Sequence, residues 1–285
     1  TSSLLIKIIA YLVYFLVVVA PLVYFPTGMF PFQIVKITFF QIIAEVIFVL
    51  WLTLAIFYPR FRPRLTPIAA AVFAFLVVAS LSAIWGVDWR NSLWFDEQRS
   101  LGLVALFHFA AFFLVLSSLK DEINWRKIWF LSFSTAFLVS LVAVSQLFLV
   151  LDKTSANQWL YIIYQLTNRP GATFSNPAFM AGYLLFNFFI GLYLLSEWVI
   201  KSSGQWSLIK NWNIWFSGIG IILIFAAIFF SQTLGAITGL GVGIIFLLLY
   251  FSIFGHCKSS GLTMSPKLNQ RSISTALLIL LILFG

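Results

Sequence analysis

Long apolar segments and short polar connections alternate along the chain. Apolar segments as long as a membrane span lie near residues 4–24, 34–58, 65–84, 101–119, 128–149, 177–199, 212–230 and 234–254, and a shorter ninth covers 273–285. A helix needs about 20 apolar residues to cross a hydrocarbon layer about 30 Å thick. The pattern therefore predicts an all-α, polytopic transmembrane helical bundle of about nine spans, the last of them incomplete.

The connections between these segments hold no soluble domain, and the chain has no internal repeat. We therefore predict one transmembrane domain over residues 1–285. The chain begins at Thr1 and ends at Gly285, inside the ninth apolar segment. We accordingly expect the sequence to be truncated at its C-terminus.

The composition also indicates a membrane protein. Of 285 residues, 62% are hydrophobic and 9% are charged, whereas soluble proteins have about 25% charged residues. A net charge of +9 would suggest nucleic acid as the partner of a soluble protein, but here the basic residues lie mostly in the connections. We therefore expect the lipid bilayer as a partner and no nucleic acid.

Lysine and arginine residues are concentrated in every second connection. The odd-numbered connections hold four, namely Arg90, Arg99, Lys153 and Arg169. The positive-inside rule places the richer, even-numbered connections in the cytoplasm. We therefore predict a cytoplasmic N-terminus and an outward position for the connections at 85–100 and 150–176. The even-numbered connections hold eleven basic residues: Arg60, Arg62, Arg64, Lys120, Arg126, Lys127, Lys201, Lys210, Lys258, Lys267 and Arg271.

The sequence carries no motif for a metal or a nucleotide cofactor. Its single cysteine, Cys257, excludes an internal disulfide bond and a cysteine-based metal cluster. Nucleotide-phosphate loops and Ser-His-Asp signatures are also missing. We therefore expect neither a metal nor a cofactor.

The second outward connection contains an arginine shortly before a well-specified helix start. Arg169 lies eight residues ahead of Pro177, which suits the first helical turn, and Asn176 suits the N-cap position. Helix N-termini and guanidinium groups both favour phosphate. We therefore predict a diphosphate site at this helix start. A contact with a lipid headgroup is the structural alternative.

The first outward connection combines charged and aromatic residues. Arg90 and Arg99 occur there with three carboxylates and with Trp89 and Trp94. Sugar rings stack on aromatic faces and hydrogen-bond to carboxylates, so this connection is a candidate glycan-binding loop. An ordinary loop at the membrane interface would have the same composition.

Two titratable residues lie inside predicted spans. Glu45 is near the middle of the second span, and His108 is about two turns inside the fourth. An ionised group in hydrocarbon is costly unless it is paired or faces a wet cavity, and Lys36 is a possible partner for Glu45. A secondary transporter or flippase that uses Glu45 and His108 is therefore an alternative function, beside a packing role for both residues.

Three segments resemble the family of O-antigen ligases and O-antigen polymerases, which are membrane glycosyltransferases. They are Gln98-Arg-Ser-Leu-Gly-Leu103, the stretch from Arg169 to Tyr183 with the pattern Arg-x-Gly-Ala-Thr-Phe-x-Asn-Pro-x-Phe-x-Ala-Gly-Tyr, and Ser231-Gln-Thr-Leu-Gly-Ala-Ile-Thr-Gly239. The resemblance covers residues from about 85 to 245 and is closest in the second segment.

The resemblance implies the C-type membrane glycosyltransferase architecture in the bacterial cytoplasmic membrane. It implies transfer of a glycan from undecaprenyl diphosphate to an acceptor, lipid A core or a growing polysaccharide, on the outer side and without a metal or cofactor. Arg169 would be the catalytic residue that holds the donor diphosphate and stabilises charge on the leaving group. Arg99, Arg90 and Asn176 would contact the substrate.

The chain departs from the family pattern at two places. Leu234 stands where the family has a second arginine. The family's large outward loop, with a histidine proposed as the general base, would follow the last residue of this chain, and the charge pattern puts His256 on the cytoplasmic side. A catalytically inactive membrane remnant is therefore a further alternative.

Overall fold

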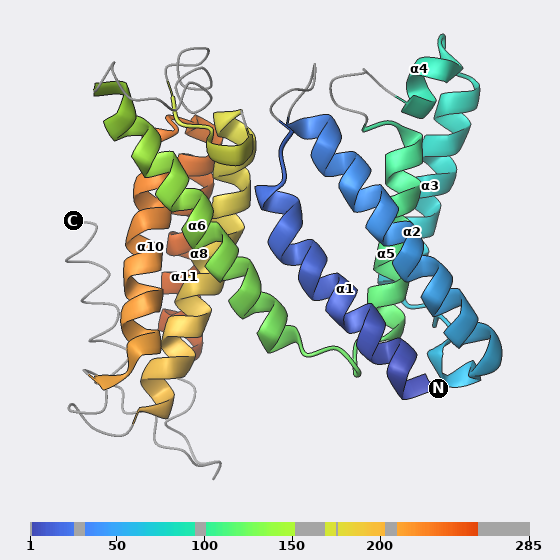
Figure 1. Ribbon diagram of the computed structural model, residues 1–285, viewed down its shortest axis with the longest axis horizontal. Coiled ribbons are helices and arrows are strands. Elements are labelled where there is room, and N and C mark those ends of the chain that lie inside the picture. The colour runs from blue at the N-terminus through green and yellow to red at the C-terminus, as the bar shows by residue number, and fades with distance from the viewer. Residues whose placement is uncertain are drawn as a thin grey trace.

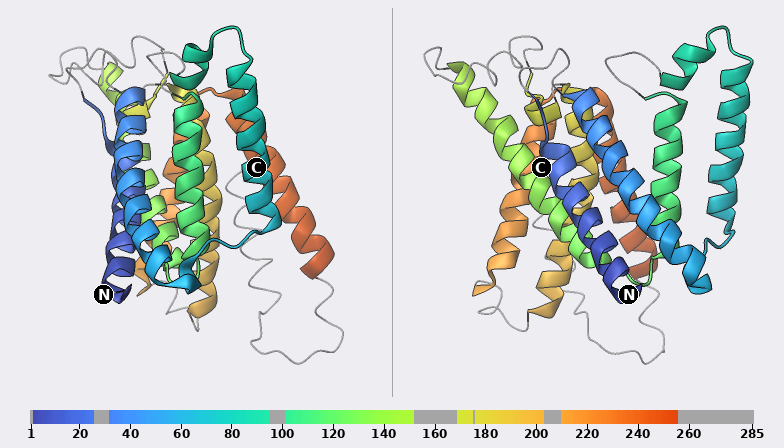
Figure 2. Two further views of the ribbon diagram at one scale, coloured as in Figure 1. Left: turned by 90° about the vertical axis from the view of Figure 1, so that its right-hand side faces the viewer. Right: turned by 45° about the vertical axis from the view of Figure 1, so that its right-hand side comes forward.

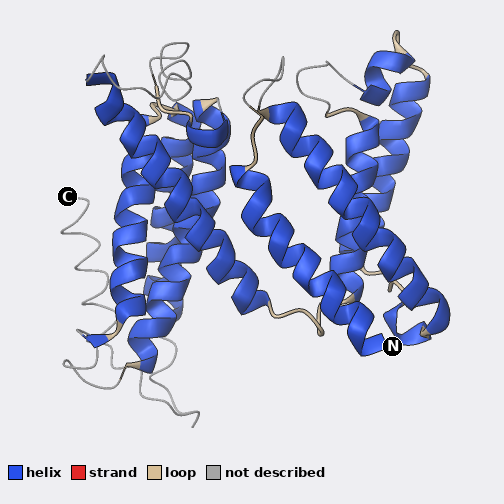
Figure 3. Ribbon diagram, in the orientation of Figure 1, coloured by secondary structure: helices blue, strands red, loops and turns tan. Residues whose placement is uncertain are grey.

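A computed structural model describes residues 2–25, 32–94, 101–151, 169–174, 176–202 and 210–255, with the side chains of 148–151 and 251–255 excepted. Within these ranges the chain is helical and contains no strand (Figure 3). The predicted all-α class is therefore confirmed for the described residues. The predicted ninth segment, 273–285, lies outside them.

The described residues form nine α-helices and two 3-10 turns. Eight of the helices coincide with the first eight predicted segments, and α4 lies in a connection for which no helix was predicted. The 3-10 turns are η1 (Pro59–Phe61) and η2 (Ala172–Phe174). The helices are α1 (Ser2–Leu22), α2 (Gln33–Phe57), α3 (Pro67–Ile84), α4 (Trp89–Trp94), α5 (Leu103–Ser118), α6 (Trp125–Leu151), α8 (Pro177–Lys201), α10 (Trp212–Phe230) and α11 (Leu234–Gly255).

Six of these helices are long and apolar enough to cross a membrane: α1, α2, α3, α6, α8 and α10. The apolar helices α5 and α11 have shorter described spans, Leu103–Ser118 and Leu234–Tyr250. The protein is therefore a polytopic helical membrane protein, with six candidate spans by length and composition within the described residues.

The helices form two groups, each with its own hydrophobic core (Figure 1). In the first group α1, α2 and α5 pack together, with α3 and α4 against α5. In the second group α6, α8 and α10 pack together, and α11 lies against α8. The contact between α1 and α6 joins the groups, and the turned views in Figure 2 show both groups from the side.

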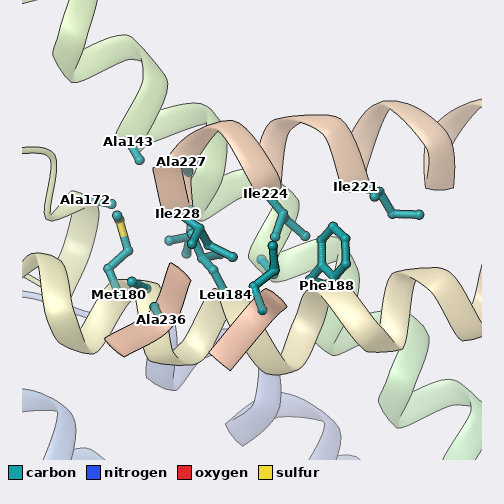
Figure 4. Packing of buried hydrophobic residues seen from close by; sticks show 14 of the residues in the cluster. Ala143, Ala172, Met180, Leu184, Phe188, Ile221, Ile224, Ala227, Ile228 and Ala236 are labelled. Atoms are coloured by element: carbon teal, nitrogen blue, oxygen red, sulfur yellow. The ribbon is translucent and has the colours of Figure 1, made fainter. Parts of the chain in front are cut away.

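The core of the second group depends on two glycines that face one aromatic ring. Phe133 of α6 is fully buried, and both Gly191 of α8 and Gly220 of α10 lie against its ring. A methyl group on either glycine would overlap that ring. Figure 4 shows the neighbouring core side chains, including Phe188, Ile221 and Ile224. Because glycine has no side chain, α8 and α10 can approach α6 closely at this ring.

The described basic residues are divided unevenly between the two ends of the bundle. Lys36, Arg90 and Arg169 lie at the end that holds α4, η2 and the start of α8. The end where the chain begins holds nine others: Lys7, Arg60, Arg62, Arg64, Lys120, Arg126, Lys127, Lys201 and Lys210. The described parts of the connections 85–100 and 150–176, which the charge pattern predicts to face outward, therefore lie at the same end of the bundle.

Replacing Gly191 or Gly220 with alanine is expected to lower the free energy of unfolding by about 1–3 kcal/mol, because the added methyl group overpacks the core around Phe133. Unfolding in lipid nanodiscs measures this. Gly182→Ala in α8 and Gly218→Ala in α10 are matched controls, because a methyl group there meets no atom within 4 Å. Equal losses in the controls would contradict the packing explanation.

Candidate functional site

Arg169 lies beside the turn between α10 and α11. Its side chain is half-buried, and Nη1 donates to the carbonyl oxygen of Gln232 at 3.5 Å across a sequence separation of 63 residues. Gln232 belongs to the third segment that resembles the glycosyltransferase family. Two of the segments singled out in the sequence are therefore neighbours in space.

Residues 169–174, which we call the pre-α8 loop, follow a fixed backbone path. Ala172 has a φ of 44°, a left-handed conformation that costs an alanine about 1–2 kcal/mol. The N–H groups of Gly171 and Ala172 both donate to Oε1 of Gln146 in α6, at 3.2 and 3.0 Å. The Ala172 methyl group is buried and lies near Met180 of α8 (Figure 4). The loop is thus held by hydrogen bonds and by the core.

The rest of the pre-α8 loop is attached to the first helix group. Thr173 Oγ1 donates to the carbonyl oxygen of Pro21 near the end of α1, at 2.7 Å. The Phe174 ring stacks on Tyr183 of α8, with ring centroids 5.2 Å apart. The ammonium group of Lys36 lies 4.9 Å from the centroid of the Phe174 ring. The loop therefore links α1 and α2 to α8.

Lys36 binds the last carbonyl groups of α1. Its Nζ donates to Ala20, Pro21 and Val23 at 3.1, 2.6 and 2.8 Å. A cation at a helix C-terminus satisfies carbonyl groups that have no partner within the helix and interacts well with the helix dipole. The sequence left Lys36 as a possible partner for Glu45, but the ammonium group donates to carbonyl groups at and just after the end of α1, and Glu45 bonds to His108 instead.

The start of α8 follows the sequence prediction. Asn176 is the N-cap, and its side-chain oxygen accepts from the N–H of Ala178 at 2.9 Å. Pro177 occupies the first turn, where a missing N–H costs nothing. The N-cap prediction for Asn176 is confirmed. Contact of Asn176 with a substrate stays a prediction.

The turn between α10 and α11 is also tightly bonded. Ser231 is fully buried, and its Oγ donates to Ile228 and accepts from the N–H of Thr233. Gln232 has a φ of 51°. Leu234, which stands where the family has its second arginine, is 75% exposed at the start of α11. Arg169 therefore contacts a hydrogen-bonded turn, and the apolar side chain of Leu234, two residues after Gln232, is exposed.

Arg90 lies apart from Arg169 in the described structure. It is exposed on α4, which packs on α3 and α5, and Figure 1 shows α4 and the start of α8 in different helix groups. Asp88 directly precedes α4, and its carboxylate accepts a hydrogen bond from the N–H of Asn91 in the first turn, at 3.0 Å. Arg99 lies outside the described residues. Substrate contacts of both arginines stay predictions.

Glu45 and His108 are bonded to each other between α2 and α5. His108 Nε2 lies 2.8 Å from Glu45 Oε1, and His108 Nδ1 lies 2.7 Å from the Val104 carbonyl oxygen. A carbonyl oxygen only accepts a hydrogen bond, and the donor and acceptor roles of the two ring nitrogens follow from the tautomer. The two side chains therefore join α2 to α5 by a hydrogen bond inside the predicted spans.

This pair borders a hollow of about 190 Å³ lined by Ala44, Glu45, Phe48, Phe107, His108 and Ala111. The Glu45 side chain is 65% exposed and that of His108 is 18% exposed. All the other lining residues are apolar. The two polar groups are therefore accessible on an apolar surface of the first helix group.

Sequence analysis missed Gln146 as a functional candidate. It is 1% exposed, and it was visible only as one polar residue within the predicted span 128–149. A glutamine in a span can form a hydrogen bond with a neighbouring helix, a buried water molecule or a loop. The partner that matters here, the pre-α8 loop, is 25 residues further along the chain.

Together these features define a polytopic helical membrane protein with a polar site at one end of the second helix group. Comparisons of the chain with protein-family models, with curated proteins and with solved structures found no match.

Replacing Lys36 with methionine is expected to lower the free energy of unfolding by about 2 kcal/mol, because three carbonyl groups near the end of α1 lose a charged donor. Thermal or denaturant unfolding in nanodiscs measures the loss. Lys7→Met, at the exposed beginning of α1, is the control and should be near neutral. A wild-type stability for Lys36→Met would refute this capping role.

Proposed function

We propose that the protein transfers a glycan from a polyprenyl diphosphate, undecaprenyl diphosphate in bacteria, to a lipid or polysaccharide acceptor. The observation that carries the proposal is the contact between Arg169 and Gln232, which joins two segments of the family pattern. In this proposal the acceptor is lipid A core or a growing glycan chain, and the enzyme needs neither metal nor cofactor.

The chemistry of the site suits a diphosphate. Arg169 supplies a guanidinium group, and the start of α8, eight residues further along the chain, supplies a positive helix end. Phosphate groups bind well at helix N-termini and to the planar donors of arginine. When the glycosyl bond breaks, the diphosphate leaves with additional negative charge, and a fixed cation stabilises it. Arg169 is therefore the proposed catalytic residue.

The backbone around Arg169 supports a functional role. Within the described residues, the non-glycine residues with positive φ are Ala172 and Gln232. One lies three residues after Arg169, and the other accepts its hydrogen bond. Left-handed backbone at non-glycine residues costs about 1–3 kcal/mol and is enriched at functional sites. The strain is concentrated where the diphosphate would bind.

The proposed membrane orientation places this site on the outer side. Among the described residues, the end with Arg169 holds few basic side chains, and the opposite end holds most of them. The positive-inside rule then gives a cytoplasmic N-terminus. A lipid-linked donor could reach Arg169 from the outer leaflet. The acceptor needs a general base, and the family resemblance suggests a histidine in that role.

Arg169→Ala, in a full-length protein that expresses normally, is expected to lower the rate of glycan transfer by about 10²–10³, the usual effect of removing one group that stabilises transition-state charge. Arg169→Lys keeps the positive charge but loses the planar set of guanidinium donors. Its transfer rate should therefore lie between that of the wild type and that of Arg169→Ala. Transfer from a labelled polyprenyl diphosphate glycan in nanodiscs measures the rates.

Arg64→Ala is the matched control for the arginine variants, because Arg64 is exposed at the opposite end of the bundle. It should retain the wild-type rate. A wild-type rate in Arg169→Ala would refute the proposed function.

The contact between Glu45 and His108 favours a second candidate function, proton-coupled transport. The two titratable side chains are bonded to each other between two helices and border a hollow. Polar groups inside a membrane often mark proton or substrate paths. In this alternative the protein moves a polyprenyl-linked substrate across the bilayer, and Glu45 and His108 carry the coupled proton.

Glu45→Gln separates the two functions. The glutamine amide can donate to Nε2 of neutral His108, so the contact survives while the exchangeable proton is lost. If the protein is a transporter, pH-driven movement of a labelled polyprenyl diphosphate in liposomes should fall at least about tenfold, the size of one lost proton-transfer group. Asp121→Asn, at an exposed carboxylate between α5 and α6, is the control. Unchanged movement in Glu45→Gln would exclude this candidate.

A further inference from the structure

We propose that Gln146 is a positioning residue for Arg169, which it orients by fixing the backbone of the pre-α8 loop. This inference rests on the proposed function, in which Arg169 binds the donor diphosphate. Gln146 itself is buried in α6 and touches the loop through its side-chain oxygen. It therefore acts on the substrate through Arg169 and not by direct contact.

The geometry gives Gln146 a specific task. Successive N–H groups normally point in different directions, but those of Gly171 and Ala172 both reach Gln146 Oε1. Such convergence requires a local left-handed residue, as in the backbone nests that bind anions, and Ala172 has this conformation. The amide oxygen of Gln146 occupies the position that an anion takes in such a nest. Its two hydrogen bonds offset part of the free-energy cost of the left-handed conformation at Ala172.

The neighbouring contacts leave Arg169 with little freedom. Thr173 is attached to α1, and Phe174 lies against α2 and α8. Arg169 is the first residue of the same loop and lies two positions before Gly171. The two hydrogen bonds to Gln146 hold the Gly171 and Ala172 amides against α6. Gln146 therefore helps to set the direction of the guanidinium group, together with the carbonyl group of Gln232.

The two ends of the Gln146 amide have different roles. Oε1 accepts two hydrogen bonds, whereas Nε2 is buried and has no hydrogen-bond partner in the described structure. A glutamate at this position would keep an acceptor oxygen for both N–H groups, and its burial favours the neutral, protonated carboxyl group. A methionine has a similar length and no comparable acceptor. Gln146→Glu is therefore the conservative variant and Gln146→Met the disruptive one.

Amide hydrogen exchange in nanodiscs, resolved to single residues, tests the contact directly. The Gly171 and Ala172 amides of the wild-type protein should be protected. In Gln146→Met their exchange should become about tenfold faster, which corresponds to the loss of one to two hydrogen bonds, and Gln146→Glu should restore protection. Wild-type amides that exchange as fast as an unstructured peptide would overturn the proposal even if the methionine variant failed to fold.

Binding of farnesyl diphosphate to the same samples tests the positioning role. Gln146→Met should weaken the affinity about tenfold, as expected for a misplaced charged contact, and Gln146→Glu should bind like the wild type. Faster exchange in Gln146→Met with unchanged affinity would overturn the positioning role, provided that Arg169→Ala weakens binding. If Arg169→Ala binds farnesyl diphosphate normally, the proposed function fails, and the exchange data still decide whether Gln146 holds the loop.

Discussion

The polar backbone of residues 170–173 in the pre-α8 loop must find its hydrogen bonds inside the protein, because these four residues are buried. Non-helical backbone is tolerated in a helical membrane protein only where protein groups or enclosed water satisfy it. Gln146 satisfies two N–H groups, and Thr173 returns a hydrogen bond to α1. This requirement explains why one loop carries so many contacts. It also fixes the residue on which the proposed chemistry depends, Arg169.

The same loop connects the two helix groups. Apart from the packing of α1 on α6, the described links include Thr173 to the end of α1 and Phe174 beneath the ammonium group of Lys36. Lys36 in turn closes the carbonyl end of α1. A movement of the first group relative to the second would therefore reach the pre-α8 loop directly. Function at Arg169 and the association of the two groups share one set of interactions.

Individual residues show where sequence reasoning succeeded and where it stopped. The Asn176-Pro177 helix start was predicted because N-capping is decided by adjacent residues. The sequence left Glu45 as a possible partner of Lys36 but could not decide it, because a long side chain can reach several groups that only folding brings near. Gln146 was missed for a similar reason: a polar residue in an apolar span does not show what it faces. The bond between Glu45 and His108 could be suspected but not assigned.

The sequence by itself determined the class of protein and the positions of its helices, because the hydrocarbon layer selects long apolar segments and the caps are local. It also set the uneven distribution of basic residues among the connections. Only the tertiary structure decided that Arg169 meets Gln232 and that Gln146 holds the loop between them. Contacts across 63 and 25 residues depend on how helices pack. Close packing is set by side-chain shape, as where the Phe133 ring lies against Gly191 and Gly220. The hydropathy of a segment does not record the shapes of its side chains.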